Sequence, residues 1–592
     1  MKALQHFFSP VKAKDIFRSG LALSPALIFL ALVFIVPLLL LLSRSFISPG
    51  GDFTSVNFYR LIESASYVKS LWLTVKIAGL TALLCVLIGY PLAYLIANSR
   101  QSTATTLLLC VLLPYWAGVL VRTFAWVVIL SRNGPANKIL QSMGAIDQPL
   151  QLIYNYSGVM LGMVNAFTPL AVILMVATMQ SIDQRLLQAA SSLGSGEGQS
   201  FWRVYFPLSL PGVLSSLLII FIVSLGTFIT PGLLGSGSDV MIAQVMIEQV
   251  EQLLNWGFAG AIGILILAST LLLLFIVTKA FGIQALSGRA NHPSSNQKPS
   301  RLAPAYLWLL DKLGHWTDQV LRVFSFGSAR RMKAHNRPSG FLKGGALLIL
   351  LFLMAPALFL VPVSFTGGEF LEWPPQGLSF RWYEAVFTSD TWIRAASRSM
   401  YVGILAAAIA VLLTLPAALA LSGQNFYGKR LVMGLMLAPM IVPHILIAIA
   451  LLLVLSPLGL VGNDAALVMG HAMICLPYTL VALMATLKNY DRNLDLAANT
   501  LGAGSFQRLS RITIPLIKPG LLAGFLIAFI TSFEELTIAM FITGGLSATL
   551  PKQLWSEMLM VASPALAAVS TLMLGFIAIL VILIHNVRSK RT

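Results

Sequence analysis

Runs of about 20 predominantly apolar residues recur along this 592-residue chain, and that length is what an α-helix needs to cross the hydrocarbon core of a bilayer. Charged residues make up only 10% of the sequence, whereas soluble domains carry about a quarter, so most of the chain is not suited to water. We therefore predict an all-α integral membrane protein with about 12 transmembrane helices, six in each half. The predicted spans are residues 21–43, 71–97, 105–130, 157–179, 207–235 and 257–282, then 343–365, 398–421, 431–455, 464–487, 515–543 and 563–587.

The formal net charge of +18 comes from Lys and Arg in the short loops and tails between the apolar runs. Such loops face the cytoplasm in membrane proteins, so the charge reports topology and does not indicate a nucleic-acid partner. The loop at 236–256, by contrast, contains acids but no Lys or Arg, which predicts the outer side. Both termini are therefore predicted to be cytoplasmic. The basic residues of the predicted inner loops and C-terminal tail are Arg100, Arg185, Arg203, Lys429, Arg430, Lys488, Arg492, Arg508, Arg511, Arg588, Lys590 and Arg591.

A basic, Pro- and Ser-rich stretch separates the two sets of spans. We predict a first domain over residues 1–285, a cytoplasmic linker over 286–342 and a second domain over 343–592. Within the linker, apolar residues recur at helical spacing over 306–324 with basic residues between them, which predicts an amphipathic helix on the inner membrane surface. The linker is too short to contain a soluble catalytic domain.

The two domains carry matching segments at a constant separation of 308 residues, and a collinear pattern of this kind indicates duplication. Upstream, prolines in the two halves match at a separation of 325, so one half is longer in the outer loop after its third span. In each copy the glycine is predicted to end a short helix and the proline to begin the next one. The matching residues are Gln188, Ala189, Ala190, Gly194 and Pro207 in the first copy, and Leu496, Ala497, Ala498, Gly502 and Pro515 in the second.

This spacing resembles the EAA loop of ABC importer permeases, a cytoplasmic helix–turn–helix between the fourth and fifth spans. Both copies lack the leading acid of that pattern, where Gln188 and Leu496 stand. The resemblance implies two tandem six-helix type I permease domains. It also implies that each loop docks on one of two separate ATP-binding-cassette ATPase subunits, so ATP is bound by those partners and this chain needs no cofactor of its own. A periplasmic solute-binding protein, a bacterial inner membrane and one fused chain per complex are further implications.

Other segments are similar to the two permeases of spermidine/putrescine-type importers. Residues 121–126, 227–235 and 255–257 look like the first permease, and 532–535 followed by 541–544 look like its partner. The order of the halves matches too, so the expected function is import of polyamines. Related permeases serve iron(III), phosphonate and opine importers, which remain alternatives for the substrate.

Two adjacent acids, Glu534 and Glu535, fall inside the predicted span 515–543, where an acidic residue costs on the order of 3 kcal/mol. We expect them to face the bundle interior, where at least one of them lines the substrate path and assists a cationic amine. The alternative is a structural role, either with Arg122 or with backbone at a helix break. The other residues expected along this path are Arg122, Ser224, Thr227 and Ser532.

The sequence offers no chemistry for an enzyme. His444 and His471 lie in apolar segments and are expected to be packing residues, and no spaced His, Cys or carboxylate set indicates a metal. Residues 423–430 mimic a phosphate-binding loop but end in Arg and follow no strand, so they do not predict a nucleotide site. An ion-coupled secondary transporter is the main rival interpretation, and a membrane-embedded enzyme is the second.

Overall fold

The computed structural model describes residues 13–48, 50–281, 340–423, 426, 428–544 and 547–589, together with positions 312, 315, 317 and 319. Most of the 286–342 linker, including nearly all of its predicted amphipathic helix, lies outside the described residues. Across the described part the chain is helical, and ten helices are long and apolar enough to cross a membrane. Two further pairs of bent helices bring the number of candidate spans to as many as 12. The all-α membrane prediction is confirmed.

The first half begins with α1 (Ala13–Leu30), the π-helical segment η1 (Ala31–Ile35) and α2 (Val36–Arg44), which together form one apolar helix. The remaining helices of this half are α3 (Val56–Glu63), α4 (Ala65–Ala97), α5 (Gln101–Trp116), α6 (Val119–Leu130), α7 (Pro135–Ser142), α8 (Tyr156–Met179), α9 (Gln184–Ser192), α10 (Glu197–Ser200), η2 (Phe201–Tyr205), α11 (Phe206–Leu225), α12 (Ile229–Leu234), α13 (Ile242–Glu251) and α14 (Trp256–Phe281).

The second half repeats this order of elements, except that η1 and α7 have no counterpart among the elements described for it. Its helices are α17 (Gly340–Val363), α18 (Arg381–Thr388), α19 (Asp390–Gly423), α20 (Lys429–Ile441), α21 (His444–Leu455), α22 (Asp464–Lys488), α23 (Asn493–Thr500), α24 (Ser505–Arg508), η3 (Leu509–Thr513), α25 (Ile514–Phe533), α26 (Thr537–Ile542), α27 (Leu550–Met560) and α28 (Pro564–Ser589).

The duplication is visible in matched hydrogen bonds as well as in the order of helices. The backbone N–H of Ile242, at the start of α13, donates to Thr74 Oγ1 in α4 over 2.8 Å. In the second half the N–H of Leu550, at the start of α27, donates to Ser399 Oγ in α19, also over 2.8 Å. These pairs keep the 308 and 325 separations read from the sequence, so the two halves share one local architecture.

Each half is built on three long helices that pack together, namely α4, α8 and α11 in the first and α19, α22 and α25 in the second. Small residues bring these helices close, as is common inside membranes. A Cβ added at Gly212 of α11 would lie 2.7 Å from Thr178 Oγ1 of α8, and Gly520 meets Thr486 in the same way. Glycine is therefore required at these two positions because α11 lies close to α8 and α25 lies close to α22.

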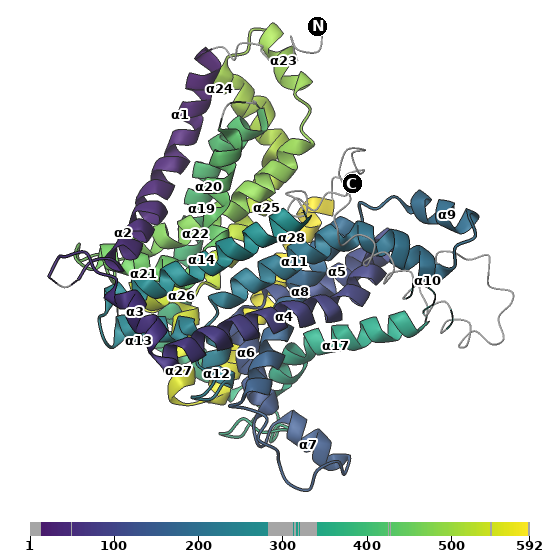
Figure 1. Ribbon diagram of the computed structural model, residues 1–592, viewed down its shortest axis with the longest axis vertical. Helices are drawn as coiled ribbons and strands as arrows, with labels where there is room; N and C mark the ends of the chain where they lie inside the picture. The colour runs from purple at the N-terminus through teal and green to yellow at the C-terminus, as the bar shows by residue number, and fades with distance from the viewer. Residues whose placement is uncertain are drawn as a thin grey trace.

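The first helix of each half packs against the other half. Helix α1 lies along α19, whereas α17 lies along α4 and α6 (Figure 1). A side-chain bond fixes the second of these contacts, because Asn165 Nδ2 in α8 donates to the carbonyl of Phe352 in α17 over 2.8 Å. Each half of the sequence therefore contributes its first helix to the bundle of the other half. This exchange holds the two bundles together.

Two predicted spans, 105–130 and 431–455, are not single straight helices. Helices α5 and α6 meet at 87° and α20 and α21 meet at 94°. The first break falls at Gly118 and the second at Pro443, at a separation of 325. Neither residue supports a continuous helix, because glycine is flexible and proline lacks the N–H that the ladder needs.

Candidate functional site

The two loops between the fourth and fifth spans form the same structure. In the first half α9 ends at a turn where Gly194 has φ +87° and the N–H of Ser195 donates to Ala190 O. In the second half α23 ends at Gly502 with φ +83°, and the N–H of Ala503 donates to Ala498 O. The predicted helix stop at each glycine is confirmed, since only a residue without Cβ adopts this left-handed conformation freely.

The prediction that Pro207 and Pro515 begin the second helix of each loop is wrong. That helix begins ten residues earlier, at Glu197 and Ser505, and continues unbroken to Leu225 and Phe533. A π-helical segment, η2 or η3, ends two residues before each proline. The wider π turn accommodates the missing N–H of the proline, so the helix passes through it without ending.

Each turn presents a leucine to its surroundings. Leu193 is 90% exposed and Leu501 is 87% exposed, and they occupy equivalent positions just before the turn glycines. Gln188, Ala189, Leu496 and Ala497 are exposed on the same short helices, whereas Ala498 is buried. The sequence analysis missed the two leucines, although the repeated Leu-Gly pair could have identified them. The two turns thus expose the same large apolar side chain at the same position.

Hydrogen bonds attach both short helices to the bundle. Gln184 Nε2, on α9, donates to Asn98 Oδ1 at the end of α4 over 2.9 Å. In the second half the guanidinium of Arg492, just before α23, donates to Gly423 O at the end of α19. The turns are therefore braced against the second span of their own half.

The second loop has an additional brace. Tyr490 donates its hydroxyl to Asp495 Oδ1 over 2.9 Å, and the side chain of Arg508 lies 3.6 Å from the same oxygen. Burial raises the pKa of the Tyr490 phenol, so the hydroxyl retains its proton at neutral pH and remains a donor. Asp495 precedes Leu496, so the second copy does carry an acid, one position before the place where the EAA pattern has it.

Glu534 joins the two halves near the centre of the molecule. Its carboxylate Oε1 accepts a hydrogen bond of 2.7 Å from the backbone N–H of Gly118, the residue at the break between α5 and α6. Glu534 itself lies at the C-terminal end of α25 and is half-buried. The second-half carboxylate thus binds the first half at the point where its third span is broken.

Glu535 has different neighbours. It is 6% exposed, and its Oε2 accepts from the N–H groups of Ile538 and Ala539 in the first turn of α26, over 2.8 and 3.2 Å. His471 Nε2 lies 3.7 Å from that oxygen, and His471 Nδ1 is within 2.8 Å of Ser532 Oγ. The sequence analysis treated His471 as packing and did not foresee that it lies between Ser532 and Glu535.

Arg122 is buried in α6, and its guanidinium donates to Ala166 O over 2.8 Å. Within the described residues no ion pair joins it to either acid. Of the two structural alternatives for the acidic pair, the geometry therefore matches backbone at a helix break and not a salt bridge with Arg122.

The equivalent positions in the first half are apolar or weakly polar. Gly226 corresponds to Glu534, and a Cβ there would lie 2.5 Å from the Cβ of Pro443, at the break of the other third span. Ser224 is buried and its hydroxyl has no hydrogen-bond partner among the residues that the structure describes, whereas Thr227 donates to Val223 O over 3.1 Å. Each broken third span thus contacts the end of the fifth span of the opposite half, but only one of the two contacts is polar.

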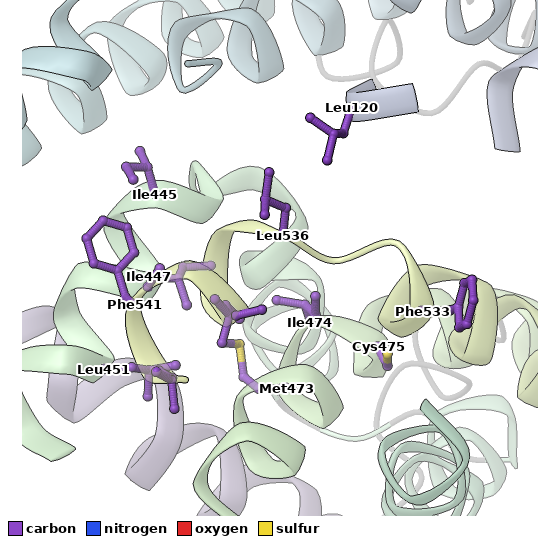
Figure 2. Close-up of a cluster of buried hydrophobic side chains, with 14 of the residues drawn as sticks. Leu120, Ile445, Ile447, Leu451, Met473, Ile474, Cys475, Phe533, Leu536 and Phe541 are labelled. Carbon is purple, nitrogen blue, oxygen red and sulfur yellow. The ribbon is translucent and has the colours of Figure 1, made fainter. Parts of the chain in front are cut away.

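Apolar side chains surround the junction, by which we mean the contacts between the broken third spans and the ends of the fifth spans. Leu120 of α6 and Leu536, the residue after Glu535, extend toward each other in Figure 2, above a layer of side chains from α21, α22 and α26. Both leucines are at most 5% exposed. Among the described residues, His, Cys, Asp and Glu side chains form no group of three or more that could hold a metal ion.

The two halves also meet through an aromatic contact. The ring of Trp555 in α27 packs edge-to-face on Phe228, at the end of the first-half fifth span, with ring centroids 5.9 Å apart. The second half therefore contacts the first-half fifth span at the end away from its turn. A helix of 29 residues is about 43 Å long, so each turn lies far from the opposite end of its own fifth span.

Comparison with known proteins relates both halves to one family. The family described as binding-protein-dependent transport system inner membrane component matches the chain twice, over residues 89–283 and 410–592. The spermidine/putrescine transport system permease protein PotB of Haemophilus influenzae is 30% identical over 266 residues, covering 43% of this chain and 92% of that protein. PotC of Escherichia coli K12 is 30% identical over 253 residues, covering 42% and 95%. A solved bacterial ABC transporter involved in alginate import matches at 19% identity with a TM-score of 0.37, covering 45% of this chain and 96% of that one.

Proposed function

Because this chain belongs to the family of binding-protein-dependent transport system inner membrane components and carries its domain twice, we propose that it supplies both membrane-spanning halves of an ATP-driven importer. It is a permease and not an enzyme, and ATP hydrolysis belongs to a separate subunit. The chain is a multi-pass membrane protein. We place it in a bacterial inner membrane, with both termini and both turns on the cytoplasmic side.

The observation that carries this proposal is the pair of equivalent turns, each of which precedes the fifth span of its own half. Each presents an almost fully exposed leucine on a short helix that is hydrogen-bonded to the bundle. A protein that docks on both turns can therefore pull on both halves through braced contacts. Two ATPase subunits, one under each turn, are the partners that fit this arrangement, with ATP bound by them and no cofactor in this chain.

The transport cycle that we propose is alternating access. A periplasmic solute-binding protein delivers substrate to the outer ends of the halves, and ATP-driven closure of the ATPase pair moves the turns. The halves then rock about the junction formed by the broken third spans and the ends of the fifth spans. One fused chain serves each complex, because it already contains both halves and covalent linkage raises their effective concentration for each other.

A polyamine is the substrate that we favour. Two permeases of spermidine/putrescine systems are among the relatives, and the junction contains a half-buried carboxylate suited to an ammonium group. We place the path along Glu534, with Ser224, Thr227 and Ser532 near it. Iron(III), phosphonate and opine importers are the alternatives, and uptake competition with these solutes distinguishes them.

The test is to express the tagged chain with its neighbouring transport genes, purify it and identify bound subunits. We expect an ATPase at two copies per chain. Spermidine uptake in the same cells should collapse on ATP depletion and persist with a proton uncoupler. Uptake that stops with the uncoupler while ATP is maintained would establish the secondary-transporter reading instead, and the absence of any bound ATPase would remove the importer proposal.

A further inference from the structure

The two adjacent acids of the junction are in different environments. Glu535 is almost completely buried and is engaged by two backbone N–H groups of its own half, from Ile538 and Ala539. A carboxylate in this position stabilises the start of α26, because the first N–H groups of a helix lack partners inside the helix. Glu535 therefore holds local structure together and has little room for a ligand.

Glu534 is half-buried, and one hydrogen bond engages it. Its Oε1 accepts from Gly118 N–H, and its Oε2 receives no hydrogen bond from the described residues. Gly118 also provides close access, because a Cβ at that position would come within 3.2–3.4 Å of the carboxylate atoms. Gly118 is the N-cap residue of α6, so this bond also lies at the start of a helix, but it involves one amide where Glu535 engages two. Glu534 therefore loses fewer hydrogen bonds than Glu535 when it exchanges its donor for another.

We propose that Glu534, and not Glu535, is the carboxylate that binds an ammonium group of the substrate, and that the ammonium displaces the Gly118 N–H from it. The inference rests on the proposed import function and assigns its substrate-binding group. An ammonium group offers three donors and a full charge, so it outcompetes a single neutral amide for a carboxylate.

The displacement has a mechanical consequence. Gly118 belongs to the first half and Glu534 to the second, so their hydrogen bond ties the two halves at the break of a third span. When an ammonium group takes the carboxylate, this tie is released. Substrate binding and the separation of the halves at this contact are therefore coupled through one hydrogen bond. The equivalent contact of Gly226 with Pro443 is apolar and does not respond to charge.

Hydrogen–deuterium exchange measured by mass spectrometry tests this directly, because the two acids protect different amides. The full complex is studied in lipid nanodiscs as wild type, Glu534→Gln and Glu535→Gln. Without substrate, Glu534→Gln should speed exchange of the peptide containing Gly118 by about 10-fold or more, which is the effect of weakening one charged hydrogen bond. Glu535→Gln should instead speed exchange at Ile538 and Ala539 and leave Gly118 protected.

Spermidine is the probe for the displacement itself. Added to the wild type, it should deprotect the Gly118 peptide to the level of Glu534→Gln, and it should have no further effect in that variant. If the wild type transports spermidine but Gly118 protection does not change, the inference is overturned. If spermidine is not transported, the polyamine proposal falls, and unchanged Gly118 protection in substrate-free Glu534→Gln would then refute the tie independently. Should that variant fail to fold, the wild-type measurement with spermidine still decides.

Discussion

Replacing the leucines at the tips of the two turns should weaken docking of the ATPase subunits. Leu193 and Leu501 are 90% and 87% exposed in the chain, so nearly all of each side chain is available for burial by a partner. Burying a leucine contributes roughly 1.5–3 kcal/mol, and truncation to alanine removes most of that. We therefore expect about 2 kcal/mol per turn, or roughly a 30-fold loss of affinity, from Leu193→Ala or Leu501→Ala.

The assay places the purified permease in nanodiscs and titrates it with its ATPase subunits. Biolayer interferometry measures the affinity of the complex. The turns are distant from each other, so the double variant should lose about 4 kcal/mol, the sum of the two single losses. Leu253→Ala is the matched control, because Leu253 is 55% exposed in the loop at the opposite end of the molecule. Equal losses for the control and the turn variants, or unchanged affinity in the double variant, would refute the reasoning.

Two further predictions concern glycines and can be measured by thermal unfolding of the purified chain. Gly502→Ala should destabilise the turn by about 1 kcal/mol because φ is +83°. Gly504→Ala in the same loop, at an ordinary φ and with open space around it, should cost less, since it loses only the preference for glycine at the N-cap of α24; equal melting temperatures would contradict the assigned turn. Gly520→Ala should cost about 1–3 kcal/mol because the new Cβ collides with Thr486, while Gly524→Ala on the same helix meets only ordinary contacts. Thr486→Ala removes the Oγ1 and Cγ2 collisions but keeps the Cβ, so it should restore part of the loss in the first variant; failure of this rescue would show that the close packing of α22 and α25 is not the cause.

Hydropathy and repeat separation were sufficient to predict the class of fold, because both are local or collinear properties of the sequence. They could not predict that α1 and α17 pack on the opposite halves, since the apolar composition of a helix does not specify which helix it packs against. Nor could they predict the breaks in the third spans, although Pro443 was a signal for one of them. Gly118 alone was a weak signal, because an isolated glycine is tolerated in membrane helices.

The acidic pair shows where sequence reasoning reached its limit. The cost of an acid in the membrane predicted that Glu534 and Glu535 need polar partners, and the structure supplies them. The partner of Glu534 is a backbone group 416 positions away, which no side-chain pattern records. His471 was read as packing because its neighbour Glu535 comes from another span. Residue types predicted the need for partners, and only the fold decided which ones.

Close packing at Gly226 explains why only one of the two equivalent contacts between a fifth span and the opposite third span is polar. The duplicated frame gives two equivalent places where a fifth span meets the opposite third span, at Glu534 with Gly118 and at Gly226 with Pro443. At Gly226 even a Cβ would lie 2.5 Å from Pro443, so a glutamate cannot be accommodated there without moving the proline. Pro443 also lacks the N–H that a carboxylate would need. A glutamate equivalent to Glu534 is therefore excluded at position 226 on both steric and hydrogen-bonding grounds, which is why the polar contact of Glu534 with Gly118 has no counterpart at Gly226.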